Sequence, residues 1–284
     1  MPKIGIVTDS GSDISQEAAK ALGVRIVPLV VTFGSETFAD GELDSEAFWA
    51  KTAVVHPQSS QPSVGAFEEA YAAIIAEGAE VLCVTITGKL SGTYNSALAA
   101  AQRFGDQVTV VDSLSLSWGQ RFQVEAALQA AREGKTRDEI VALLQDVRDR
   151  THFYIILDTI ENLKKGGRAS KLIAVVEKVV RFFNIKPILL VKEGELGLLG
   201  TANSFARGLL RIQKETLAHS PFERLASLYT RDAEPAAKFA QDLAEKIGWK
   251  PEDIPLQEIG VAVSVHGGAG AVAVAVLAAS KGGA

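Results

Sequence analysis

Residues 81–93, VLCVTITGKLSGT, decide the fold of this 284-residue chain. The first four residues form an apolar run that is typical of a buried strand, and a hydroxyl-rich turn follows them. A helix is expected to begin near Ser91 and to continue through the alanine-rich segment that ends at Ala101. At such a junction, free backbone N–H groups and the positive end of the helix dipole face one point, which suits a carboxylate or another oxyanion.

Ser91 by itself also fits an ordinary helix N-cap, because serine side chains commonly accept a hydrogen bond from the first turn of a helix. A ligand site is favoured by the way polar residues gather elsewhere, since ligands of doubly wound sheets bind beyond the carboxyl ends of the strands. Hydroxyl and acidic side chains follow several predicted strands or precede a helix at the same edge: Thr8, Asp9, Ser10, Ser12, Ser59, Ser60, Ser63, Thr87, Ser91, Thr93, Asp112 and Ser113. Both interpretations of Ser91 stay open on these residues alone.

The first half of the chain alternates between strands and helices, which predicts a parallel sheet covered on both faces. Strands are expected at residues 3–7, 24–33, 81–84 and 108–111. Helices are expected at residues 15–22, 45–52, from 64, from about 91, 118–131 and around 140–147, with a turn or short hairpin at 34–41. Residues 1–150 are therefore predicted to form an N-terminal parallel α/β domain.

The second half has a different rhythm, and residues 151–284 are predicted to form a C-terminal α/β domain with a mixed or largely antiparallel sheet. Strands are expected at 153–157, 225–229 and 261–265, and a hairpin joins 187–191 to 196–201. A polar turn is expected at 161–168 and helices at 170–180, 204–217 and 233–247. The apolar run at 269–279 is shorter than the roughly twenty residues that span a bilayer, so we expect a buried helix there.

The composition excludes several classes of function. The 29 Lys and Arg and 34 Asp and Glu residues give a net charge of -5 without a basic cluster, so nucleic-acid binding is not expected. Neither a glycine-rich nucleotide motif nor a Gly-x-Ser-x-Gly elbow occurs. Four histidines and one cysteine lack the spacing of zinc ligands, so no metal or cofactor is expected. The single cysteine and the lack of a leader-like or spanning segment predict a cytoplasmic protein without stable membrane insertion.

Two residues of the second half are candidates for a ligand site. His266 is expected to end a strand and to open a glycine-rich turn before a helix, where an imidazole can face a cleft. Arg168 lies in a Gly-Gly-Arg turn and can guide an anion if it forms one wall of an interdomain cleft. The other histidines, His56, His152 and His219, are expected to be solvated or structural.

The chain resembles the DegV family, which includes the fatty-acid-binding subunits of bacterial fatty acid kinase. Five segments carry the resemblance in family order over nearly the whole chain: VTDSGSD at 7–13, SSQPS at 59–63, LSGTYNSA at 90–97, LKKGGR at 163–168 and the turn at His266. The resemblance implies two α/β domains with a long-chain fatty acid in a buried apolar tunnel between them.

The resemblance also implies roles for individual residues. The resemblance implies Ser91, Ser59 and His266 as carboxylate-binding residues. Thr93, Ser60 and the backbone at Gly92 are predicted to join them. Ser59 stands where the family commonly has threonine, and Arg168 is implied at the mouth of the site.

Two segments depart from the family pattern. The turn at His266 lacks the proline of the frequent His-x-Gly-Pro-Gly, which is expected to loosen the turn. Residues 200–207, GTANSFAR, replace a basic Arg-Thr-x-x-Lys-type segment that many members carry after the hairpin. If that surface meets the kinase in other members, partner recognition differs in this chain, or the partner is absent.

The predicted function is that of a carrier, not an enzyme: the chain binds a long-chain fatty acid and presents its carboxylate to the catalytic subunit of a fatty acid kinase, which supplies ATP and Mg²⁺ for acyl-phosphate formation. Burial of about fifteen methylenes contributes on the order of 12 kcal/mol before binding costs. Hydrogen bonds to the carboxylate offset the cost of burying its charge. Two alternatives remain, a hydrolase that uses Ser91 with His266 and Asp9 or Asp112, and a lipid-acid carrier or sensor without a kinase.

Overall fold

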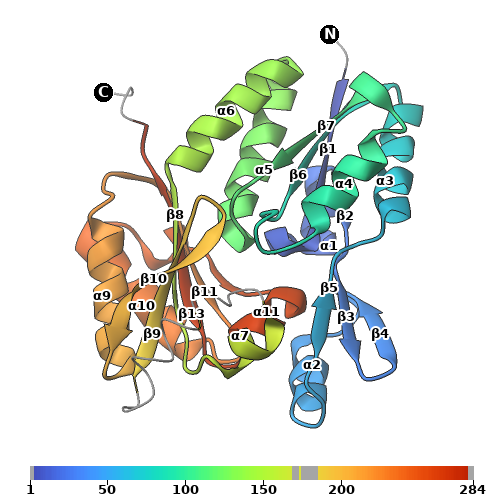
Figure 1. The fold of residues 1–284 in the computed structure, drawn as a ribbon. Helices are drawn as coiled ribbons and strands as arrows, with labels where there is room; N and C mark the ends of the chain where they lie inside the picture. The colour runs from blue at the N-terminus through green and yellow to red at the C-terminus, as the bar shows by residue number, and fades with distance from the viewer. Residues whose placement is uncertain (1–2, 168–172, 174–184, 281–284) are drawn as a thin grey trace. The chain divides into compact units, whose positions relative to one another are not determined.

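The computed structural model describes residues 3–167, 173 and 185–280, and the chain divides into two compact units (Figure 1). The first unit consists of Met1–Asp149 together with Gly260–Ala262, and the second of Arg150–Ile259 and Val263–Ala284. The predicted α/β fold is confirmed, since a parallel sheet lies in the first unit and a mixed sheet in the second.

The main sheet of the first unit is parallel throughout, with the order β2-β1-β6-β7. Its strands are β1 (Lys3–Asp9), β2 (Val24–Val27), β6 (Ala79–Thr85) and β7 (Val108–Asp112). The helices of this unit are α1 (Gln16–Leu22), α2 (Ser45–Thr52), α3 (Val64–Ala76), α4 (Thr93–Ala101), α5 (Ser117–Arg132) and α6 (Arg137–Asp149).

Both faces of this sheet are covered, because successive side chains of a strand point to opposite faces. In β6, Val81 and Cys83 pack with residues of α3 and α4, whereas Leu82 and Val84 pack with residues of α5 and α6. All four are fully buried, so the apolar run of the sequence forms the centre of a doubly wound sheet.

A second, antiparallel sheet of the first unit has the order β4-β3-β5 and was not predicted. It contains β3 (Val30–Phe33), β4 (Glu36–Ala39) and β5 (Gln58–Ser60), and Phe33 packs edge-on against Phe48 of α2. The single strand predicted at 24–33 is wrong, because β2 ends before Pro28 and β3 belongs to the other sheet. Proline has no N–H to donate to a ladder and so interrupts the strand.

The six-stranded sheet of the second unit has the order β10-β9-β8-β13-β11-β12, and among these strands only β11 and β12 pair in parallel. Its strands are β8 (Thr151–Ile156), β9 (Lys186–Lys192), β10 (Glu195–Ala202), β11 (Phe222–Tyr229), β12 (Leu256–Glu258) and β13 (Val272–Ala278). Helices α9 (Phe205–Leu217) and α10 (Glu234–Ile247) pack on one face. The helix α7 (Glu161–Gly166) contributes Leu163 to a smaller cluster with Leu189.

Three predictions for the second half are wrong. Residues 161–168 contain helix α7, residues 261–265 belong to helix α11 (Val261–Gly267), and the apolar run at 269–279 contains the strand β13. β13 lies between β8 and β11 and is buried on both faces, so no polar residue marks the strand period in it. The helix predicted at 170–180 lies outside the described residues except for Ile173.

The segment Gly260–Ala262 belongs to the first unit although the chain around it belongs to the second. The Gly260 N–H donates to Asp13 Oδ1 at 2.9 Å, and the Ala262 N–H donates to Asp40 Oδ1 at 3.4 Å. Burial raises the pKa of Asp13 from 3.8 to about 7 and also raises that of Asp40. Two buried carboxyl groups therefore hold this segment in the first unit.

Candidate functional site

The turn after β6 is held by the ends of both neighbouring strands. The Ile86 N–H donates to Asp9 Oδ2 at 2.7 Å, at the end of β1, and the Gly88 N–H donates to Asp112 Oδ2 at 3.0 Å, at the end of β7. The Thr87 N–H donates to the Ser115 carbonyl at 2.9 Å. These bonds fix the backbone that leads to α4.

Two hydroxyl groups lie together where α4 begins. Ser91 Oγ and Thr93 Oγ1 are 2.7 Å apart, and the Thr93 N–H donates to Ser91 Oγ at 3.3 Å. The helix begins at Thr93, two residues later than predicted, and its N-cap is Gly92, without a side-chain cap. Gly92 thus holds the N-cap position, while the Ser91 hydroxyl accepts the N–H of the first helical residue and so keeps a capping contact. The arrangement places two hydroxyls at the positive end of a helix, where an oxyanion is stabilised.

Gln61 lies directly against Gly92, so the motifs SSQPS and LSGT meet in the first unit. A Cβ atom at position 92 would lie 2.5 Å from Gln61 Oε1, so a larger residue there requires the end of the Gln61 side chain to move. Of the two predicted serines before Gln61, Ser59 is half-buried in β5 and Ser60 is exposed. Gln61 was not among the predicted site residues, although the Ser-Gln-Pro motif contained it.

The polar residues at the end of β1 and directly after it form hydrogen bonds within the fold. Thr8 donates its hydroxyl to the Val84 carbonyl at 2.7 Å, and Ser12 donates its hydroxyl to the Asp9 carbonyl at 2.9 Å. Asp9 is fully buried and accepts hydrogen bonds from the Gly11 N–H and the Gln120 amide. Burial raises the pKa of Asp9 to about 7. This buried network has no surface to offer a ligand.

The carboxyl groups that the hydrolase alternative requires also have structural partners. Asp9 holds the turn at Ile86, and Asp112 accepts the N–H groups of Gly88 and Leu114. Over the described part of the chain, no group of three or more His, Cys, Asp or Glu residues could hold a metal ion.

His266 is the last residue but one of α11, so the prediction that it ends a strand and precedes a helix is wrong. A Cβ atom at Gly166 would overlap the His266 ring at Nδ1. Gly167, with φ of 66°, provides the left-handed end of α7. The two glycines of the LKKGGR motif thus have separate tasks, one of which is to make room for the imidazole.

The turn that follows His266 is held by Thr230, at the end of β11. The Thr230 hydroxyl donates to the Gly268 carbonyl at 2.6 Å and accepts the Ala271 N–H at 2.9 Å. Asn162 of α7 donates to the Val265 carbonyl at 3.4 Å. These side chains fix the turn without the proline that the family often has, and the sequence offered no local signal for them. Arg168 lies outside the described residues.

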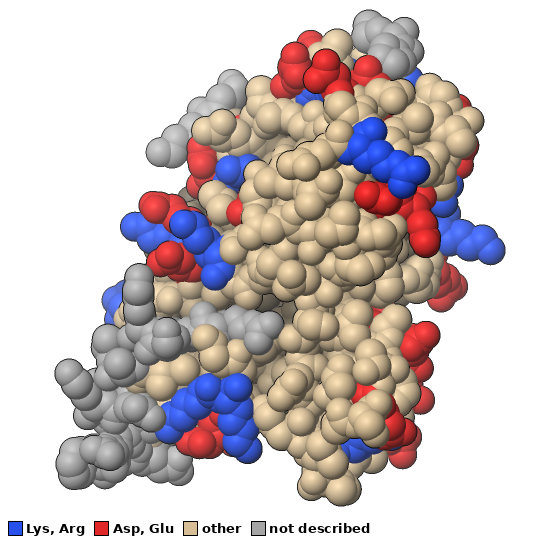
Figure 2. All heavy atoms as spheres, turned by 45° about the vertical axis from the view of Figure 1, so that its right-hand side comes forward, with Lys and Arg blue, Asp and Glu red and all other residues tan. Residues whose placement is uncertain are grey.

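Two further features are the distribution of charged side chains on the surface and the length of the helices. Figure 2 shows acidic and basic side chains interspersed on one face, with a wide area that carries neither. No helix of the described residues is long and apolar enough to cross a membrane. Together with the two sheets, these features describe an α/β protein with two units.

The chain belongs to the DegV family. The family model described as uncharacterised protein, DegV family, matches residues 3–279. A DegV domain-containing protein of Deinococcus radiodurans is 35% identical over 96% of this chain and 97% of its own length. Another, of Streptococcus pyogenes serotype M3, is 32% identical over 97% of this chain and 99% of its own length.

Solved structures show the same fold. A DegV family protein from Thermus thermophilus, described as fatty acid binding, has a TM-score of 0.88 and 32% identity, with 98% of this chain and 100% of that chain covered. A DegV family protein from Eubacterium eligens, described as loaded with heptadecanoic acid, has a TM-score of 0.83 and 25% identity, with 97% and 100% covered.

Proposed function

We propose that this protein binds a long-chain fatty acid and that the hydroxyls of Ser91 and Thr93 hold the carboxylate. The observation that carries the proposal is the 2.7 Å hydroxyl pair at the beginning of α4. The similarity to the fatty-acid-binding protein of Thermus thermophilus supports it. The remaining proposed carboxylate-binding residues are Gly92, Ser59, Ser60 and His266, with Arg168 at the mouth.

The chemistry of the hydroxyl pair suits a carboxylate that is held but stays reactive. A hydroxyl donates one hydrogen bond, and bonds to an ionised partner are about twice as strong as neutral ones. The dipole of α4 favours negative charge at the same point. Two hydroxyl donors can bind one oxygen of the carboxylate, which leaves the other oxygen available to a second reactant.

We propose further that the bound fatty acid is presented to a partner kinase, which forms the acyl phosphate with ATP. This step gives a reason for a carrier without a nucleophile of its own. The alternative of a carrier or sensor without a kinase shares the same ligand site. The hydrolase alternative is disfavoured because Asp9 and Asp112 hold the backbone of the β6 turn.

Mass spectrometry of ligands extracted from the purified protein tests the first step. Long-chain fatty acids at a substantial fraction of one equivalent are the expected result. A protein that carries none, and that binds none when they are added, would contradict the proposal.

A kinase assay tests the second step. With a bacterial fatty acid kinase catalytic subunit, ATP and Mg²⁺, the loaded protein is expected to yield acyl phosphate, and His266→Ala is expected to lower the yield strongly. His56→Ala serves as the matched control, because His56 lies outside the proposed site. Fatty-acid binding without any acyl phosphate would favour the carrier or sensor, and normal turnover of His266→Ala would remove His266 from the site.

A further inference from the structure

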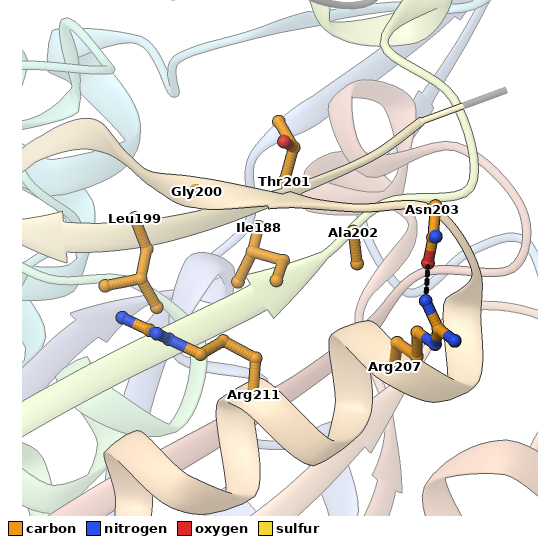
Figure 3. A pocket seen from close by; sticks show the side chains of 8 residues that line it. All are labelled: Ile188, Leu199, Gly200, Thr201, Ala202, Asn203, Arg207 and Arg211. Carbon is orange, nitrogen blue, oxygen red and sulfur yellow. Dashed lines mark hydrogen bonds between the residues drawn. The ribbon is translucent and has the colours of Figure 1, made fainter. Parts of the chain in front are cut away.

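A cavity of about 400 Å³ lies in the second unit between the β9–β10 hairpin and helix α9 (Figure 3). The side chains of Ile188, Leu199 and Ala202 point from the hairpin toward the helix and form an apolar wall. On α9, Arg207 points toward Asn203 at one end of the cavity, whereas Arg211 points toward Leu199 at the other end. The volume falls within the range of small-molecule sites, which are mostly apolar with a few polar groups.

An irregularity in β10 shapes the apolar wall. The register of β10 against β9 shifts between Leu198 and Gly200, which is a β-bulge. Leu198 packs in the cluster of α7, and Leu199, the next residue, packs in the core that faces α9. In a regular strand Leu199 and Ala202, three residues apart, would face opposite sides of the sheet, and the bulge brings both onto the face that packs with α9. Bulges often re-aim side chains beside functional sites.

The positions of the two arginines in α9 are electrostatically unfavourable for the helix itself. Arg207 is the third residue of α9, in a first turn that contains no acidic residue, and cations are unfavourable at that end of a helix. Arg211 lies one turn further, and like charges four residues apart destabilise a helix. Arg207 donates to the neutral Asn203 Oδ1 at 3.0 Å, and Arg211 Nε pairs with Glu215 at 2.8 Å.

Among the described residues that line the cavity, none has an acidic side chain. Both arginines are exposed, and the contacts with Asn203 and Glu215 each use one nitrogen of a guanidinium, which has further N–H donors. The whole chain has a net charge of -5, so this pair of cations does not follow from a generally basic protein.

We propose that this cavity binds a small phosphate monoester, with the exposed side chains of Arg207 and Arg211 turned toward its phosphate and its organic part against the apolar wall. Guanidinium groups bind phosphate through paired hydrogen bonds. The three terminal oxygens of a phosphate monoester can accept from two guanidiniums at once when both flexible side chains turn toward the ligand, which the two oxygens of a carboxylate do less readily. This site does not depend on the proposed fatty-acid function.

Titration of the full chain with n-butyl phosphate, followed by amide NMR shifts, tests the proposal. We expect saturable shifts centred on residues 200–211, with a dissociation constant of about 1 mM or tighter. Inorganic phosphate, which lacks the apolar part, is expected to bind more weakly, and n-butanol, which lacks the charge, is expected not to bind. Equal binding of butyl phosphate and inorganic phosphate would mean that the apolar wall has no part, and no saturable binding would overturn the proposal.

Position 200 allows a matched pair of variants, because a Cβ atom there meets nothing within 4 Å. Gly200→Asp brings a negative charge to the cavity, and Gly200→Asn has the same shape without the charge. The Asp variant is expected to bind butyl phosphate about tenfold more weakly than the Asn variant, because a like charge now faces the phosphate. Equal affinity of the two variants would overturn the site.

The arginines are tested on the same helix. Arg207→Gln and Arg211→Gln are each expected to weaken binding about tenfold or more, through loss of a charge-assisted contact. Lys214→Gln removes a cation of α9 that does not line the cavity and is expected to change binding less than twofold. A loss that is as large for Lys214→Gln would show that only the general charge of the helix matters and would overturn the assignment.

Discussion

The polar segment after β1 is used inside the fold, whereas the polar segment after β6 leaves a pair of hydroxyls at the start of a helix. Asp9, at the end of β1, is fully buried and accepts hydrogen bonds from three groups of the same unit. Ser91 is half-buried, and its hydroxyl shares a 2.7 Å contact with Thr93. Both segments lie at carboxyl ends of adjacent parallel strands. Position at this edge of the sheet therefore does not predict whether a polar residue stabilises the fold or is available to a ligand.

The difference lies in what each polar group contacts. Around Asp9 the partners are backbone N–H groups and a buried amide. Buried donors of this kind need an acceptor in the folded protein whether or not a ligand is bound. Ser91 and Thr93 form a contact that a ligand oxygen can replace. The scaffold segment should therefore control stability, and the hydroxyl pair should control ligand binding.

Replacement of Asp9 is expected to have the largest effect. Asp9→Ala leaves the N–H groups of Ile86 and Gly11 without their acceptor and should lower the free energy of unfolding by about 3 kcal/mol or more. Urea unfolding measures this loss. Wild-type stability in the Asp9→Ala variant would contradict the scaffold role.

The pH dependence of Asp13 is the next largest effect. Its pKa is raised from 3.8 to about 7, so the folded state binds more protons between these values, and stability falls as pH rises through that window. Asp13→Asn removes this titration, and asparagine tolerates the φ of 55° at this position.

Urea unfolding of both proteins at pH 5 and pH 7 measures the change. The wild type should lose about 2 kcal/mol more than the Asp13→Asn variant over this interval. Parallel pH profiles would show that Asp13 is ionised in the folded protein throughout.

Ser91→Ala tests the other side of the comparison. The variant should bind a long-chain fatty acid roughly ten- to thirtyfold more weakly, as for one lost hydrogen bond to a charged group, with a change in unfolding free energy below about 1 kcal/mol. Ser63→Ala is a matched control, because Ser63 caps α3 and should affect stability but not affinity. Unchanged affinity of Ser91→Ala would remove it from the site.

Gly92→Ala is expected to have the smallest effect. The added methyl must displace the end of the Gln61 side chain, which is flexible, so the stability cost should stay below about 1 kcal/mol. Gln61→Ala should restore any lost stability in the double variant, and calorimetry can detect that coupling. A large loss that Gln61→Ala does not relieve would point to strain in the backbone at Gly92.

The parallel sheet was predictable because each of its strands is a short apolar run between polar turns. β13 was not predicted, since its alternating valines and alanines are all buried and alanine also favours helices. A period of two was present in Val272, Val274 and Val276, which pack on the α9 and α10 core. Pro28 marks the break between β2 and β3 in the sequence, but the apolar residues on both sides of it favoured one continuous strand.

Part of the candidate site was also predictable. The proximity of Ser91 and Thr93 follows from their spacing, and the resemblance to a family singled them out. The contact of Gln61 with Gly92 and the bonds of Thr230 to the turn after His266 depend on chain segments that are distant in sequence. No local pattern contains such contacts, because tertiary packing alone creates them.

The three residues Gly260–Ala262 affect when the first unit can finish folding during synthesis, because they come late in the chain. During synthesis the first 149 residues emerge early, yet the carboxyl groups of Asp13 and Asp40 gain their backbone partners only when residues 260–262 have left the ribosome. Until then, each carboxyl group lacks a backbone donor, although Ser117 and Ser10 donate their hydroxyls to Asp13 and Asp40. The first unit is therefore complete only after almost the entire chain has been synthesised, and residues 1–149 alone lack part of that unit.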